Sequence, residues 1–255
     1  MSASTERHER FHSARRDPRL CVLEGLHAIK HALRFAATIQ EVVTRDAAEL
    51  EQLATELAPD VAARILELAD TVPPTEYDAL APLSHPTGVM AIARRRVWEP
   101  EEILAQPAQP AQPAQPVVFL EEPVHLGNIG AVVRVAAAAA AAGVLSSGRH
   151  DPWSPESVRA AAGLHYAVPV ARVQGAPVCP GRLVAFDADA PELGAHPLPA
   201  ASVLAFGSER RGLSDELLAR ADMRASLPMR AGVSSLNLAT AVAAALYTLR
   251  AARSR

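Results

Sequence analysis

Apolar residues recur at regular spacing through the first hundred residues. Residues 24–35 and 47–57 carry leucine or isoleucine every three or four positions, which is typical of amphipathic helices. Residues 39–43 and 88–93 are short apolar runs that predict strands. Two weaker elements are expected at residues 62–69 and 77–83. Helices and strands that alternate over about 80 residues predict a small α/β domain.

The pattern changes after residue 116 but stays α/β. Short apolar runs predict strands at residues 117–120, 144–146, 168–173, 183–186 and 203–206. An alanine-rich helix is expected to open at residues 128–130 and to continue to about residue 142, where Gly143 ends it. A final helix is expected over residues 236–252, with leucine and valine at core spacing. This order of elements predicts a mostly parallel sheet.

A proline tract separates these two regions. Residues 105–116 read AQPAQPAQPAQP, and proline at every third position opposes helix and sheet and favours an extended polyproline II spacer. We therefore expect four parts: a basic N-terminal extension, a first domain, a Pro-rich linker and a second domain, at residues 1–20, 21–97, 98–116 and 117–255.

Charge alone does not identify a partner. The net charge of the 255 residues is −3, and Lys30 is the only lysine. Arginines cluster near the N-terminus, at residues 94–96 and near the C-terminus. These clusters fit a phosphate-binding surface, but they equally fit a solvated surface in an arginine-rich composition.

Compartment and metal content are suggested by what the sequence lacks. Cys21 and Cys179 stand far apart without metal-ligand spacing, so we expect free thiols in a reducing cytoplasm and no metal. The longest apolar run, residues 135–145, is too short to span a membrane. Residues 1–16 have no apolar core of the signal-peptide kind, so export is not expected.

The first candidate motif is HLGNIGAVVR at residues 125–134. Asn128 and Arg134 lie on the first turns of the predicted helix, on roughly related faces, beside backbone amides that can receive an anion. The alternative is a helix-capping asparagine with a surface arginine.

Two further motifs follow predicted strands, where open α/β sheets place their ligands. FGSERRGL at residues 206–213 has glycines on both sides of Ser208 and Glu209, which allow close approach of a ligand, but it matches neither a dinucleotide fingerprint nor a Walker loop. LPMRAGVSSLNLATA at residues 227–241 places Ser234, Ser235 and Asn237 where a helix begins, so capping competes with ligand binding.

Taken in order, the three motifs resemble those of SpoU-type (TrmH-like) RNA ribose methyltransferases of the SPOUT superfamily. The family pattern N-x-G-x-x-x-R is matched at residues 128–134, G-x-E-x-x-G-[LI] at residues 207–213, and [IL]-P-M followed by S-L-N at residues 227–237. Residues 22–33 and 84–95 more loosely resemble the family's N-terminal L30e-like domain, which binds the RNA substrate. The chain departs at Ala161, where a serine is usual, and at Glu121, where an aspartate often stands.

This resemblance implies an α/β fold with a deep C-terminal trefoil knot, a homodimer with its site near the subunit interface, and S-adenosyl-L-methionine as cofactor. By the same resemblance, the residues expected at the cofactor are Phe206, Gly207, Gly212, Leu227, Met229 and Leu236. The residues expected to be catalytic are Arg134, Asn128, Glu209, Ser235 and Asn237.

The implied reaction is methylation of a ribose 2′-hydroxyl, with ribosomal RNA preferred over transfer RNA as substrate. Arginine has a pKa above about 12 and is a poor proton acceptor, so we expect Arg134 to orient the nucleotide and bind phosphate. An ion pair between Arg134 and Glu209 is a further hypothesis.

Other functions were weighed against this one. A catalytically silent RNA-binding protein of the same fold is an alternative. An unrelated nucleotide-dependent oxidoreductase is disfavoured because the glycine fingerprint is missing. The sequence leaves the target nucleotide open, and also whether methylation confers antibiotic resistance.

Overall fold

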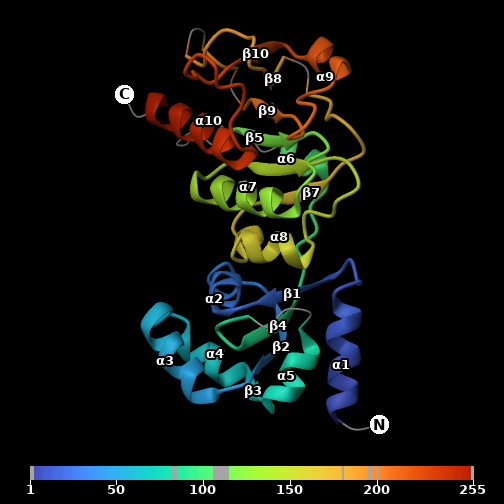
Figure 1. Cartoon of the computed structure of the whole chain (residues 1–255), viewed down its shortest axis with the longest axis vertical. Helices are drawn as coiled ribbons and strands as arrows, with labels where there is room; N and C mark the ends of the chain where they lie inside the picture. The colour runs from blue at the N-terminus through green and yellow to red at the C-terminus, as the bar shows by residue number, and fades with distance from the viewer. Residues whose placement is uncertain are drawn as a thin grey trace. The chain divides into compact units, whose positions relative to one another are not determined.

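The computed structural model describes residues 3–81, 85–105, 115–179, 181–194, 197–199 and 201–253 (Figure 1). The chain forms two compact units: Met1–Arg96 with Trp153–Ala167, and Val97–Pro152 with Val168–Arg255. The expected polyproline spacer falls largely on residues 106–114, which lie outside the described residues, as does Arg255 of the C-terminal arginine cluster.

The first unit is built on a mixed sheet in the order β1-β4-β2-β3. The central strand β4 is antiparallel to β1 and β2, and β2 is parallel to β3. The strands are β1 (Leu20–Glu24), β2 (Ile39–Thr44), β3 (Ala69–Thr71) and β4 (Val89–Arg94). The helices before β4 are α1 (Ala3–Ala14), α2 (Leu26–Arg34), α3 (Ala47–Leu57), α4 (Ala62–Leu68) and α5 (Pro74–Leu80).

Helix α1 replaces part of the basic extension that we expected at residues 1–20. Phe11 and Ala14 are its buried apolar residues, too few to produce a clear periodic pattern in the sequence. Arg7 donates to Glu41 at 2.7 Å and also contacts Asp70 and Glu76. Ion pairs therefore occupy this arginine, which does not fit a free phosphate-binding surface.

A segment from the second half of the sequence, Trp153–Ala167, packs within the first unit. It contains α8 (Pro155–Ala160) and the 3-10 turn η1 (Leu164–Tyr166). Arg159 donates to the buried carboxylate of Glu24 at 2.8 Å, and the Tyr166 hydroxyl donates to the Arg94 carbonyl at 2.9 Å.

The arginine cluster at residues 94–96 is mostly engaged in holding this unit together. The Arg95 guanidinium donates to the Leu20 carbonyl at 2.5 Å, and that of Arg96 donates to the Tyr166 carbonyl at 3.0 Å. Only Arg94 of the three has an exposed side chain. The cluster as a whole is therefore not the open phosphate-binding surface that the sequence left possible.

Gly163 is a position where the first unit depends on a missing side chain. Its φ is +73°, and a Cβ there would lie 2.5 Å from the Ala28 oxygen. We expect Gly163→Ala to destabilise the protein by roughly 2–4 kcal/mol, from left-handed strain plus overpacking. Gly175→Ala is the matched control, because its φ is +87° but nothing lies within 4 Å of its Cβ position. Equal losses in denaturant titrations of the two variants would contradict the close approach.

The second unit is an all-parallel sheet in the order β10-β8-β9-β5-β6-β7. Figure 1 shows α7 and α10 running beside one another, and the two helices are in contact. The strands are β5 (Val117–Leu120), β6 (Gly143–Ser146), β7 (Val170–Arg172), β8 (Leu183–Phe186), β9 (Val203–Phe206) and β10 (Met223–Ala225). The helices are α6 (Pro100–Leu104), α7 (Leu126–Ala138), α9 (Asp215–Arg220) and α10 (Leu238–Arg253). The predicted α/β class is confirmed.

Helix α7 ends four residues earlier than we predicted. Ala140 adopts a left-handed conformation with φ +56°, and the Ala141 amide donates back to Ala136 at 2.9 Å, which closes the helix without glycine. Gly143 instead begins β6, where a Cβ would overlap the Ile103 side chain. The glycine serves close packing between β6 and α6 rather than helix termination.

Buried apolar side chains on the strands fill the centre of the second unit. Phe119, Leu145 and Ala205 are fully buried within one cluster. No helix in the described ranges is long and apolar enough to cross a membrane.

Candidate functional site

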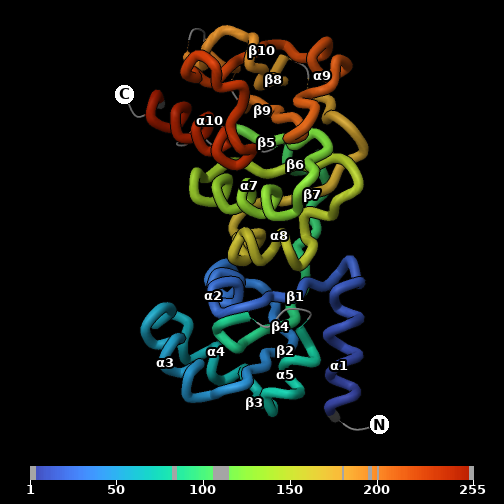
Figure 2. Tube along the Cα trace, viewed as in Figure 1, coloured from blue at the N-terminus to red at the C-terminus, as the bar shows by residue number. Residues whose placement is uncertain are grey.

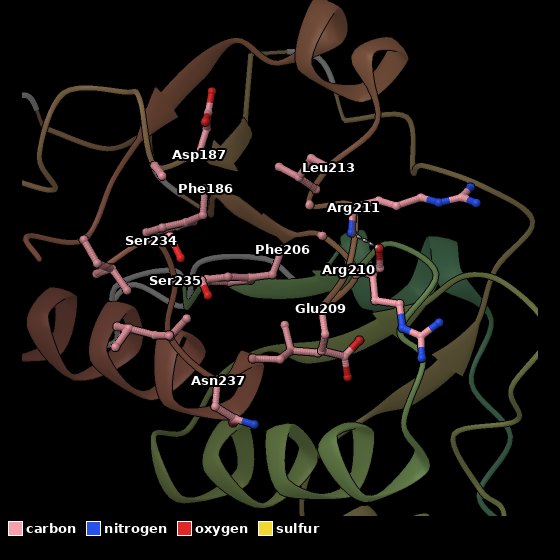
Figure 3. A pocket seen from close by; sticks show the side chains of 18 of the residues that line it. Phe186, Asp187, Phe206, Glu209, Arg210, Arg211, Leu213, Ser234, Ser235 and Asn237 are labelled. Atoms are coloured by element: carbon pink, nitrogen blue, oxygen red, sulfur yellow. Dashed lines mark hydrogen bonds between the residues drawn. The ribbon is translucent and has the colours of Figure 1, made fainter. Parts of the chain in front are cut away.

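A cavity of about 830 Å³ opens where β8, β9 and β10 end. Its walls come from all three sequence motifs, and Figure 3 labels Glu209 of the second motif and Ser235 and Asn237 of the third. The lining residues are 186–188, 206–213, 218, 226–227 with 229, 234–238 and 241, together with His125 and Asn128 at the start of α7. The carboxyl ends of parallel strands are the general ligand site of open α/β sheets.

A hydrogen-bond network joins the three motifs. The Asn128 side-chain amide donates to Glu209 at 2.5 Å, and the Asn237 amide donates to the Asn128 oxygen at 3.1 Å. The other Glu209 oxygen accepts from the Val124 backbone amide at 3.0 Å. These side chains therefore hold one another and fix the relative positions of three loops.

Capping and pocket lining coexist at the third motif. The Asn237 oxygen accepts from the amides of Ala239 at 2.9 Å and Thr240 at 3.4 Å, so it caps α10 as the sequence allowed. Asn128, in contrast, lies inside the first turn of α7, whose N-cap is His125. The capping alternative for Asn128 is therefore wrong.

The pKa of Glu209 lies below its ordinary value of 4.5. Burial raises it, but the hydrogen bonds from Asn128 and from the Val124 amide outweigh burial. A carboxyl group whose pKa is lowered by folding stabilises the folded protein at pH values above its ordinary pKa. This contribution is lost as the pH falls through the lowered pKa of the folded state. We expect the stability difference between wild type and Glu209→Gln to be constant above about pH 5 and to shrink on further acidification. Thermal unfolding from pH 3 to 8 measures it, and a pH-independent difference would contradict this assignment.

The turn after β9 is closed by its own backbone. Ser208 and Gly212 exchange hydrogen bonds of 3.0 and 2.9 Å, and Gly212 has a φ of +67°. A Cβ on Gly207 would overlap the backbone of Gly212 and Leu213. Gly207 thus permits the turn to close on itself, whereas we expected this glycine to make room for a ligand.

Aromatic and aliphatic side chains form much of the remaining wall. The rings of Phe186 and Phe206 stack with centroids 4.5 Å apart and planes 12° from parallel. The expected cofactor residues Phe206, Gly207, Gly212, Leu227, Met229 and Leu236 all line the cavity, and so does the expected catalytic Ser235.

Sequence reasoning missed the contribution of β8. Phe186 ends this strand and Asp187 follows it, and both line the cavity (Figure 3). The strand itself was predicted at residues 183–186, so the signal available was its position beside β9 in a parallel sheet.

Arg134 does not join the other expected residues. It lies on α7 with an exposed side chain and is not among the residues that line the cavity. Six residues of helix turn its direction about 120° away from that of Asn128, so the two are not on related faces. Within the described part of this chain Arg134 and Glu209 form no ion pair, and Glu209 accepts hydrogen bonds from Asn128 and the Val124 amide.

The parallel sheet and its motif-lined cavity define the chain as an α/β protein with a ligand site at the strand ends, and comparison identifies its family. The model of the SpoU rRNA methylase family matches residues 115–247. Because this match spans more than half of the sequence, the chain belongs to the SpoU rRNA methylase family. The resemblance read from the three motifs is confirmed.

Individual relatives match nearly the whole chain. The 23S rRNA (guanosine(2553)-2'-O)-methyltransferase RlmP of Bacillus subtilis is 25% identical, covering 90% of this chain and 88% of its own length. The AdoMet-bound rRNA methyltransferase of Sinorhizobium meliloti is 25% identical with a TM-score of 0.75, covering 99% of this chain and 97% of its own. AviRb of Streptomyces viridochromogenes, in complex with AdoMet, has a TM-score of 0.77 at 22% identity, covering 99% and 98% respectively, and shows the shared fold.

Proposed function

We propose that the protein transfers a methyl group from S-adenosyl-L-methionine to a ribose 2′-hydroxyl of ribosomal RNA. The observation that carries this proposal is the meeting of the three family motifs in one cavity, joined through Asn128, Glu209 and Asn237. The Bacillus subtilis and Sinorhizobium meliloti relatives are named as rRNA methyltransferases, which supports rRNA as the substrate class.

The cavity fits the cofactor in size and chemistry. Its volume of about 830 Å³ lies within the range of small-molecule pockets. Leu227, Met229 and Leu236 offer apolar surface to an adenine ring, and Phe206 adds a buried aromatic wall. Loop amides offer polar partners for the amino-acid end of the cofactor. These residues would hold the cofactor, which when bound supplies an electrophilic methyl group on a sulfonium sulfur.

The remaining task of the protein is to position the ribose oxygen and to manage its proton. Asn128 and Asn237 keep the site's geometry, and Ser235 is placed to contact the nucleotide. Arg134 would bind the phosphate next to the target ribose and hold the hydroxyl in line. A permanently protonated guanidinium cannot accept the hydroxyl proton, so that proton goes to solvent or to the neighbouring phosphate.

A homodimer would bring Arg134 to the chemistry. Arg134 is exposed and lies outside the lining of its own chain's cavity, so we propose that it acts at the cavity of a second copy. Val233 and Leu236 beside the cavity and Tyr247 on α10 are exposed apolar side chains that a dimer would cover. We also propose that the C-terminal region carries the trefoil knot typical of the family.

We assign RNA recognition to the N-terminal domain, residues 21–97, and catalysis to residues 117–255. The relatives match both parts of the chain, which supports this two-part organisation, and residues 153–167 of the second part pack in the first unit. The cytoplasm, where rRNA is accessible, is the proposed location.

Radiolabelled methyl transfer tests the function. Purified protein is incubated with labelled S-adenosylmethionine and either 16S, 23S or transfer RNA, and the product is digested to nucleosides. We expect label in a 2′-O-methyl nucleoside from one rRNA. Label in transfer RNA alone would make transfer RNA the substrate class in place of rRNA. Label in a methylated base would contradict the proposed reaction.

A further inference from the structure

Two neighbouring arginines, Arg210 and Arg211, stand on the turn that follows β9. The backbone of this turn is closed between Ser208 and Gly212 and is fastened through Glu209 to the start of α7. In Figure 3 both guanidinium groups lie across the pocket from Ser234 and Ser235. The backbone that carries them is therefore held in place before any ligand arrives.

Both guanidinium groups lack a partner within the described part of the chain. Both side chains are exposed and both line the cavity. The adjacent carboxylate of Glu209 already accepts bonds from Asn128 and Val124. Some exposed arginines elsewhere, such as Arg34, pair with a carboxylate, here Asp60 at 2.6 Å. Two positive charges thus remain uncompensated at the rim of the pocket.

We infer that Arg210 and Arg211 bind RNA phosphates beside the target ribose other than the one assigned to Arg134, an inference that rests on the proposed function. A guanidinium group binds phosphate oxygens through a planar pair of donors. Because the net charge of the chain is −3, RNA must be attracted by local clusters of positive charge. A ribose that enters the cavity brings a phosphate on each side, and the rim is where those phosphates pass.

The other anion expected in the cavity is the carboxylate of the cofactor's methionine moiety. That group carries one charge and belongs to a small molecule that pockets enclose. Two adjacent exposed guanidinium groups instead match a polymer with repeated charges. The two assignments differ in one measurable respect, because only binding of the cofactor's carboxylate would make cofactor affinity depend on these arginines.

The test is the salt dependence of RNA binding by Arg210→Gln/Arg211→Gln. The affinity for a 23S rRNA transcript is measured between 50 and 300 mM KCl. The logarithm of the affinity falls with the logarithm of the salt concentration, with a slope of roughly 0.7 for each single-strand phosphate contact. We expect the slope of the double variant to be shallower by roughly 1.4, and that of each single variant by half as much. Arg149→Gln/Arg172→Gln removes equal charge from residues outside the cavity lining and should keep the wild-type slope. Affinity for S-adenosylhomocysteine and the melting temperature should be unchanged in all variants.

Each other outcome overturns a specific claim. An unchanged slope in the double variant, with wild type binding normally, contradicts phosphate binding by these arginines. A drop in S-adenosylhomocysteine affinity assigns them to the cofactor and also contradicts it. Wild-type protein that neither binds nor methylates rRNA contradicts the proposed function, and the inference falls with it.

Discussion

Arg134→Ala is expected to lower kcat by at least about 100-fold, the scale of losing one charged group that acts in the transition state. The same variant should bind S-adenosylhomocysteine as wild type does, because Arg134 does not line the cavity. It should also melt at the wild-type temperature, since the side chain is exposed. Single-turnover methyl transfer, binding calorimetry and scanning calorimetry measure the three effects on the same preparation.

The control for this prediction keeps the positive charge at residue 134 but removes the planar guanidinium group. Arg134→Lys should recover only part of the activity, because an ammonium binds phosphate as a point charge. Mixing Arg134→Ala with Asn237→Ala subunits tests the dimer. If each site takes Arg134 from one chain and Asn237 from the other, a mixed dimer holds one intact site and regains activity. Full activity of Arg134→Ala alone would remove this residue from the mechanism, whatever the oligomeric state.

Gly207→Ala is expected to abolish cofactor binding. The added Cβ would overlap the backbone of Gly212 and Leu213, which cannot yield as a flexible side chain can. The turn after β9 must then open, and with it the contacts of Glu209 to Asn128 and Val124. We expect S-adenosylhomocysteine affinity to fall at least 100-fold, or about 2.7 kcal/mol, and stability to fall by about 1–3 kcal/mol.

Gly127→Ala is the matched control on the neighbouring helix. Gly127 lies in α7, and nothing lies within 4 Å of its Cβ position. Alanine in an open helical site should leave stability unchanged or raise it by up to about 1 kcal/mol. If Gly207→Ala behaved like Gly127→Ala in both calorimetry and unfolding, the tight turn would not be needed for the site.

Buried strands were the elements most fully predictable from the sequence. Strands β5, β8 and β9 have the predicted bounds, because each is a short apolar run buried on both faces of a parallel sheet. Strand β10 and helix α9 were missed, because three or six residues with mixed polarity carry no clear period. Helix α1 was missed for a related reason, as its position depends on ion pairs of Arg7 with distant carboxylates.

The part of the site that was predictable from the sequence consists of residues within the three motifs. Asn128, Glu209 and Asn237 meet as the family resemblance implied. The partner of Glu209 was not predictable, because spacing along α7 does not report which side chain faces the turn after β9. Phe186 and Asp187 belong to no motif, and their place in the cavity follows from strand order, which only the three-dimensional fold supplies.

The most direct measurement is a map of ribose methylation in rRNA exposed to this protein. Unmethylated 23S and 16S transcripts are treated with protein and S-adenosylmethionine, and positions that resist alkaline cleavage are located by sequencing. A single new 2′-O-methyl position with wild type, absent with Arg134→Ala, is the predicted result. Intact cofactor binding with no protected position in either rRNA would contradict the proposed function.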